Sequence, residues 1–188
     1  MKRILLMVIK NIVLVPWMWI KLCYHAKHTE KYTEEEQYKM LRFITLHANK
    51  GGNVKIDVHG AENLPKDNGF MFFPNHQGLY DVLAIIEACP RPFSVVAKKE
   101  IANIQFLKQV FACMKAYMLD REDVRQAMQV IVHVTEEVKR GRNYLIFAEG
   151  TRSKKAGVSF VIVRIGYRAM ALPARWCWTP CSRSISPM

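Results

Sequence analysis

The chain has 188 residues, of which 51% are hydrophobic and 23% are charged. This composition is typical of a single folded domain and excludes an intrinsically disordered chain. The formal net charge is +12, which favours an anionic partner such as lipid headgroups, a phosphorylated metabolite, an acidic carrier protein or nucleic acid. The five cysteines form no CxxC pair and no metal-ligand spacing, so they are predicted to be reduced thiols that face the cytosol.

The first predicted element is an apolar helix near the amino terminus. Residues 4–20 contain only two strongly polar side chains, one of them Lys10, and no signal-peptide cleavage site follows. A membrane span needs about 20 apolar residues, and a central lysine disfavours insertion. Trp17 and Trp19, with basic residues on both sides, are typical of a helix at the membrane surface. We therefore expect residues 1–30 to form a membrane-associated helix, with a true span and a buried core helix as the alternatives.

The following residues alternate helices with short apolar strands. Thr33 and Glu36 have the spacing of a capping box, which predicts a helix that runs to Gly51. The alternation predicts an α/β domain over residues 31–157, with a mostly parallel sheet flanked by helices. Its remaining predicted elements are strands at 54–58 and 70–73, a helix at 79–88, a strand at 94–97, a helix at 104–114, a strand at 116–119, a helix at 122–140 and a strand at 144–148.

Three of these strands end in polar clusters. The first cluster contains Asn-His-x4-Asp, in which His76 stands five residues before Asp81. The second contains Arg121, and the third begins with Glu149. Ligand sites of parallel sheets lie at the carboxyl ends of the strands. The sequence therefore predicts that the three clusters form one site.

Each cluster also has a structural interpretation. A chain with six histidines shows His-x4-Asp by chance rather often. His76 is then a helix-entry histidine, and Asp81 is an acid that the helix dipole favours in the first turn. The shared position at strand ends favours a site instead. Gly-x-Ser-x-Gly, His-Glu-x-x-His and the common nucleic-acid-binding signatures are all absent from the sequence, which argues against a serine hydrolase, a zinc hydrolase and a nucleic-acid-binding domain.

Together the clusters resemble the glycerol-phosphate and lysophosphatidate acyltransferase family. The resemblance rests on Asn-His-x4-Asp at 75–81, on Phe-x-Glu-Gly-Thr-Arg-Ser at 147–153 and, more loosely, on residues 117–121. It covers about residues 54–153, and Ala148 stands where the family usually has proline. The resemblance implies a glycerolipid-acyltransferase-like fold and acyl transfer from acyl-CoA or acyl-carrier protein to the hydroxyl of lysophosphatidic acid. This reaction forms phosphatidic acid, at the cytoplasmic face of the cell membrane.

The chemistry of this reaction suits the residues of the three clusters. An alcohol must lose its proton as it attacks a thioester, whereas the thiolate leaves without much acid assistance. His76 is the expected base, and Asp81 is expected to orient its imidazole. Neither a cofactor nor a metal is needed, because the acyl donor is a co-substrate. The resemblance implies that the acceptor, with its phosphate, is bound by Arg121, Glu149, Gly150, Thr151 and Arg152.

Residues 158–188 depart from the family's pattern. After Ser153 the chain has six basic residues and no acidic one. We expect poor packing from about Val158 onward and no strand after residue 172, as a shift of the reading frame between Lys155 and Arg175 would produce. The chain is then an inactive, truncated homologue. The alternatives are a native basic tail that binds anionic lipid, and a basic membrane- or nucleic-acid-binding protein without catalysis.

Overall fold

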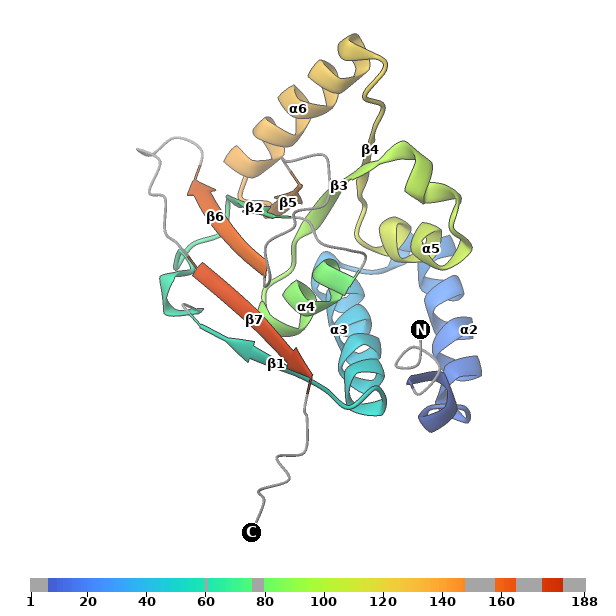
Figure 1. Ribbon diagram of the computed structural model, residues 1–188. Coiled ribbons are helices and arrows are strands. Elements are labelled where there is room, and N and C mark those ends of the chain that lie inside the picture. Colours follow the sequence, from blue (N-terminus) through green and yellow to red (C-terminus); the bar gives the residue numbers. More distant parts are fainter. Residues whose placement is uncertain (1–6, 60, 76–79, 148–157, 165–173, 181–188) are drawn as a thin grey trace.

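The computed structural model describes residues 7–59, 61–75, 80–147, 158–164 and 174–180, the last two ranges as backbone only. Within these residues, one seven-stranded sheet is covered by helices on both faces (Figure 1). The elements are α2 (Leu14–Lys27), η1 (Thr29–Lys31), α3 (Glu34–Gly51), β1 (Val54–Val58), η2 (Ala61–Asn63), β2 (Phe70–Pro74), α4 (Tyr80–Ala88), β3 (Ser94–Lys98), η3 (Lys99–Asn103), α5 (Gln105–Cys113), β4 (Tyr117–Leu119), α6 (Val124–Lys139), β5 (Tyr144–Ile146), β6 (Val158–Arg164) and β7 (Ala174–Pro180).

The predicted elements between residues 33 and 148 are confirmed, with ends that differ by at most two residues. The capping box of α3 is complete. The Thr33 hydroxyl accepts a hydrogen bond from the Glu36 N–H at 3.3 Å, and the Glu36 carboxylate accepts one from the Thr33 N–H at 2.8 Å. These bonds satisfy amide groups that the first turn of a helix leaves without partners. The short 3-10 helices were not predicted, because a single turn leaves no periodic pattern.

The strand order is β1-β7-β6-β2-β5-β3-β4. β2, β5, β3 and β4 are parallel to one another, whereas β6 and β7 pair antiparallel with their neighbours. The prediction of an α/β fold with a parallel sheet between helices is confirmed, and the parallel part consists of these four neighbouring strands. Their carboxyl ends therefore lie at one edge of the sheet.

The prediction that no strand follows residue 172 is wrong, because β7 spans Ala174–Pro180. β6 pairs with β2, where Arg164 lies opposite Phe70, and β7 pairs with β1, where Pro180 lies opposite Val54. The edges of β1 and β2 offer backbone donors and acceptors that an extended segment can satisfy whatever its side-chain pattern. β6 is also rich in valine and isoleucine, which favour strands. That a frame shift produced this tail stays a prediction.

The two faces of the sheet have separate cores, because successive side chains of a strand point to opposite sides. Helices α2 to α5 cover one face and α6 covers the other (Figure 1). The first core includes Leu22, Tyr38, Phe70, Phe72, Ile85, Val95, Phe111 and Leu145. The second core consists of Met71, Val96, Val134, Val138 and Tyr144.

Helix α2 is buried along one side only. Met18, Leu22 and His25 are buried, and Trp19 stacks on Phe106 of α5 with the ring centroids 6.4 Å apart. On its other side α2 and the residues before it expose apolar side chains to solvent. Within the part of the chain that the structure describes, no helix combines the length and apolarity that a membrane crossing requires. The exposed apolar residues are Val8, Ile9, Ile12, Val13, Leu14, Trp17, Ile20 and Tyr24.

Candidate active site

The three predicted clusters follow strands whose carboxyl ends share one edge of the sheet. β2 ends at Pro74, β5 at Ile146 and β4 at Leu119, and these three strands are parallel. Of the predicted site residues, Asp81 and Arg121 are described. The others lie outside the described residues, so their placement stays a prediction; they are His76, Glu149, Gly150, Thr151 and Arg152.

Asp81 lies in the first turn of α4 and is only 3% exposed. A polar network holds this helix against α3. The Tyr80 hydroxyl donates to the side-chain oxygen Oδ1 of Asn49 at 2.6 Å, and the side-chain Nδ2 of Asn49 donates to the Glu87 carboxylate. Arg42 donates to the backbone carbonyl of Glu87 at 2.9 Å. Asp81 is thus a buried carboxylate on a firmly anchored helix, a short distance along the chain from the carboxyl end of β2.

Arg121 follows β4 in a loop that is held in place by hydrogen bonds. Asp120 pairs with Lys99 at 3.2 Å and accepts a hydrogen bond from the Glu122 N–H at 3.1 Å. The hydrogen bond from the Glu122 backbone, followed by that from Lys99, lowers the pKa of Asp120. The Gln126 side chain accepts from the Asp120 N–H at 3.0 Å. These contacts join the ends of β3 and β4 to the start of α6 and set the position of Arg121.

Lys98, the last residue of β3, is a cation at this edge that the sequence analysis missed. It lines the same cavity as Arg121, and its ammonium pairs with the Glu100 carboxylate at 2.7 Å. The available signal was its position at the end of a buried strand, the criterion that selected the other clusters. The sequence does not single out Lys98, because the charged residues that follow β3 resemble an ordinary solvated surface.

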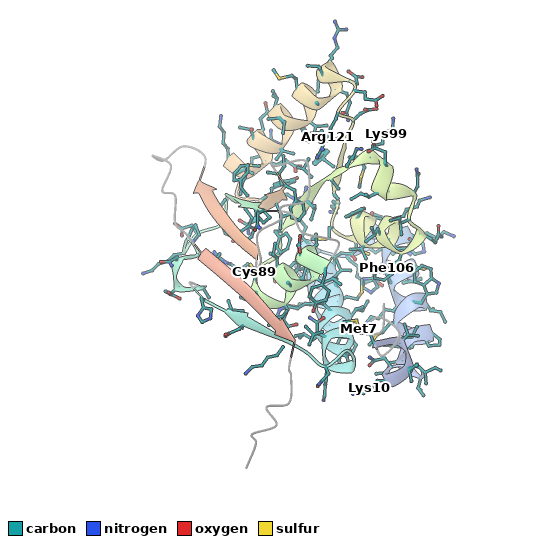
Figure 2. The ribbon with its side chains drawn as sticks, viewed as in Figure 1. Met7, Lys10, Cys89, Lys99, Phe106 and Arg121 are labelled. Atoms are coloured by element: carbon teal, nitrogen blue, oxygen red, sulfur yellow. The ribbon has the colours of Figure 1, made fainter. Side chains whose placement is uncertain are left out.

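A large cavity, mostly lined by apolar side chains, opens at the same edge. Its volume is about 1160 Å³, and it extends from Lys98 and Arg121 to the amino-terminal residues. Arg121, Phe106 and Met7 all line it and lie along one side of the molecule (Figure 2). A cavity of this size and character suits a long apolar ligand with a polar end. Its other lining residues include Val15, Met18, Trp19, Leu22, Ile44, Ala48, Tyr80, Leu83, Ala97, Leu107, Val110, Phe111, Leu119 and Phe147.

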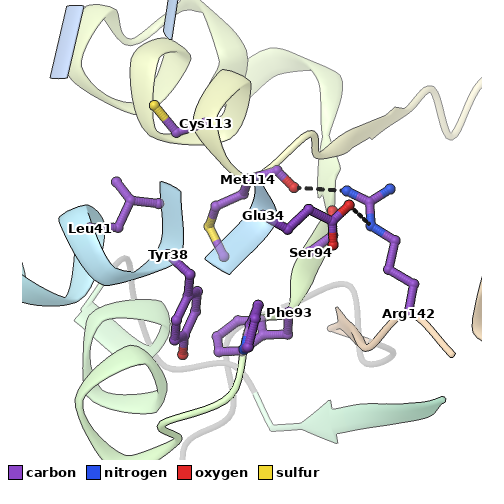
Figure 3. A pocket seen from close by; sticks show the side chains of 9 residues that line it. Glu34, Tyr38, Leu41, Phe93, Ser94, Cys113, Met114 and Arg142 are labelled. Carbon is purple, nitrogen blue, oxygen red and sulfur yellow. Dashed lines mark hydrogen bonds and ion pairs between the residues drawn. The ribbon is translucent and has the colours of Figure 1, made fainter. Parts of the chain in front are cut away.

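A second pocket, at the amino end of the parallel strands, is too small for a substrate. Its volume is about 10 Å³, roughly the space of one water molecule. Arg142 lines it and pairs with Glu34 at 2.9 Å, and its guanidinium also donates to the carbonyl of Met114 at 3.4 Å (Figure 3). Arg142 also pairs with Glu137 at 2.7 Å. This pocket is part of a structural network.

Among the described residues, no group of three or more His, Cys, Asp or Glu side chains could hold a metal ion. His76 and Glu149 lie outside those residues. The expectation that neither a metal nor a cofactor is needed therefore stays a prediction.

The arrangement of strands and helices is that of a glycerolipid acyltransferase. The chain matches the crystal structure of the 1-acyl-sn-glycerophosphate acyltransferase PlsC from Thermotoga maritima, with a TM-score of 0.61 and 23% sequence identity. The match covers 84% of this chain and 64% of that one. The sequence model of the acyltransferase family also matches residues 55–186, more than half of the chain. The chain therefore belongs to the acyltransferase family, as its motifs indicated, and the matched range includes β6 and β7.

Similar proteins are 1-acyl-sn-glycerol-3-phosphate acyltransferases from bacteria and eukaryotes. One from Borreliella burgdorferi is 33% identical over 101 residues, which are 54% of this chain and 40% of that protein. One from Saccharomyces cerevisiae is 33% identical over 101 residues, 53% of this chain and 33% of the relative. The alpha form from Mus musculus is 28% identical over 121 residues, which are 63% of this chain and 42% of that protein. The matched segment thus spans less than half the length of each relative.

Proposed function

We propose that the protein transfers an acyl group from a thioester donor, acyl-CoA or acyl-carrier protein, to the free hydroxyl of lysophosphatidic acid. The observation that carries this proposal is the apolar cavity of about 1160 Å³ that opens beside Lys98 and Arg121 at the carboxyl edge of the sheet. Such a cavity accommodates an acyl chain, while the basic rim accommodates a phosphate. The names of the relatives support the same acceptor.

In the proposed mechanism, His76 removes the proton of the acceptor hydroxyl as its oxygen attacks the thioester carbonyl carbon. The tetrahedral intermediate then expels the thiolate, which recovers the proton. Asp81 orients the imidazole and stabilises its protonated form. The burial of Asp81 and the network that anchors α4 support this role, because an orienting carboxylate must be held in place.

Cations at the rim are proposed to bind the phosphate of the acceptor. A guanidinium matches phosphate oxygens with two parallel hydrogen bonds, whereas an ammonium acts as a point charge. The position of Arg121 and Lys98 at the mouth of the cavity supports their participation. Arg152 is assigned the same role from its motif, in which Glu149, Gly150 and Thr151 shape the pocket.

We further propose that the exposed apolar side of α2 rests on anionic lipid at the cytoplasmic face of the membrane. Val13 is 85% exposed and Ile20 is 68% exposed, and the Lys21 ammonium lies over the ring of Trp17 at 4.9 Å. An apolar helix face with tryptophan and lysine at its border is typical of interfacial helices. The acceptor and the product are themselves lipids, so this orientation gives the cavity direct access to them.

The experiment is an assay of thiol release with lysophosphatidic acid and acyl-CoA or acyl-carrier protein. His76→Ala should lower the turnover by about 10²–10⁴-fold, because base catalysis is lost. His59→Ala is the matched control, since His59 is an exposed histidine that pairs with Asp57 on β1. A His76→Ala enzyme that keeps more than a tenth of the wild-type turnover refutes the mechanism. No thiol release by the wild-type protein with any glycerolipid acceptor favours the inactive homologue instead.

A further inference from the structure

Lys98, which lines the cavity, forms an ion pair with Glu100. Lys98 ends β3, and Glu100 stands in the first turn of η3. Their charged atoms are 2.7 Å apart, and the two side chains are 44% and 59% exposed. The hydrogen bond from Lys98, followed by one from its own backbone, lowers the pKa of Glu100, so it is an anion at neutral pH. In the free protein the Glu100 carboxylate is therefore bound to the ammonium group of Lys98, which lines the cavity.

A second ion pair, between Lys99 and Asp120, lies next to it in the sequence. Asp120 contacts Lys99 and also accepts the backbone hydrogen bond of Glu122, which ties it to its loop. Asp120 also repels Glu100 electrostatically. Because exposed ion pairs are weak, the pair between Lys98 and Glu100 can open at little cost.

We infer that Glu100 is a specificity-determining residue, whose carboxylate holds the Lys98 ammonium in the free enzyme and gives way to the phosphate of the acceptor. This inference rests on the proposed function. A phosphate monoester carries a charge of about −1.5 to −2 at neutral pH and offers three acceptor oxygens, so it competes well with one carboxylate. An acceptor without a phosphate leaves the pair closed. Glu100 thereby favours phosphorylated acceptors.

Steady-state kinetics with Glu100→Gln test this inference. The variant should lower KM for lysophosphatidic acid by about two- to fivefold at unchanged kcat, because the competing carboxylate is gone. KM for the unphosphorylated monoacylglycerol with the same acyl chain should not change. Glu122→Gln is the matched control, since Glu122 is an exposed acid on the same rim that does not form this ion pair. In a Lys98→Met background, Glu100→Gln should have no further effect.

A binding measurement without turnover separates this inference from the proposed reaction. The affinity for glycerol 3-phosphate, measured by ³¹P NMR titration, should rise by the same factor in Glu100→Gln and not in Glu122→Gln. Tighter binding without any thiol release supports the inference and refutes the proposed reaction. Three results overturn the inference: weaker binding by Glu100→Gln, an equal gain in Glu122→Gln, or a gain that persists in the Lys98→Met background.

Discussion

The two ends of the parallel strands differ in how they use polar groups. At the carboxyl edge, charged side chains border an open apolar cavity of about 1160 Å³. At the amino edge, charged and amide side chains bond to one another around a void of about 10 Å³. Polar groups at the first edge thus border a space large enough for a ligand, whereas those at the second surround almost no space. We propose that catalysis and stability depend on opposite ends of the same strands.

Asn143 shows how completely the amino edge is bonded. It is 3% exposed, and its carbonyl oxygen accepts the N–H of Gly69 at 2.9 Å. Its amide donates to the carbonyl of Pro92 at 2.9 Å and to Asn68 at 3.1 Å. Gly69 has a φ of +91°, and a Cβ there would lie 2.7 Å from the carbonyl oxygen of Val138. One side chain therefore joins the starts of three strands, at a turn that requires glycine.

The largest expected effect is at the carboxyl edge. Asp81→Asn keeps the shape of the side chain but loses the charge that is proposed to stabilise a protonated His76. We expect kcat to fall by about 10²–10⁴-fold in the thiol-release assay, with the melting temperature close to that of the wild type. Asp57→Asn, on the exposed strand β1, is the control. A large loss of stability with little loss of turnover would show that Asp81 stabilises the fold and does not take part in catalysis.

At the amino edge we expect the reverse, a loss of stability without a loss of turnover. Arg142→Met leaves Glu137 and Glu34 without their shared cation, although both carboxylates keep some contact with water. We expect a loss of about 2–3 kcal/mol in the free energy of unfolding, measured by urea denaturation, because a largely buried pair is broken. Arg140→Met, at an exposed position, should lose little. Turnover per folded molecule should stay at the wild-type value, and a kcat reduced tenfold contradicts the division between the two edges.

The smallest effect is a pH dependence of the amino edge. Burial tends to raise the pKa of Glu137, but hydrogen bonds from Tyr144 and Arg142 outweigh it and hold the pKa below its ordinary value of 4.5. A lowered pKa in the folded state stabilises the fold above pH 4.5, and this contribution is lost as the pH falls through the folded value. The difference in unfolding free energy between wild type and Glu137→Gln should therefore shrink as the pH falls below 4.5. A difference that grows on acidification contradicts the assignment.

Much of the fold follows from local patterns. The capping box at Thr33 and Glu36, the strand alternation at 54–58 and the strand–helix alternation as far as residue 147 predicted elements that the structure contains. The order of motifs also placed Asp81 and Arg121 after strands that proved to be parallel. Such patterns are readable because helix and strand periodicity depends on neighbours within one or two turns.

The tertiary structure alone decided three other features. Residues 174–180 became a strand because the edge of β1 offered hydrogen-bonding groups, although the local pattern gave no such indication. The cavity is enclosed by α2, α3, α5 and the strand ends, and its position made Lys98 a rim residue. The network of Arg142 joins residues more than 100 positions apart in the sequence. The sequence determined the helices and strands between residues 33 and 148. Contacts between distant residues decided the strand at 174–180 and what the elements enclose, because packing and pairing partners leave no periodic signal in the chain.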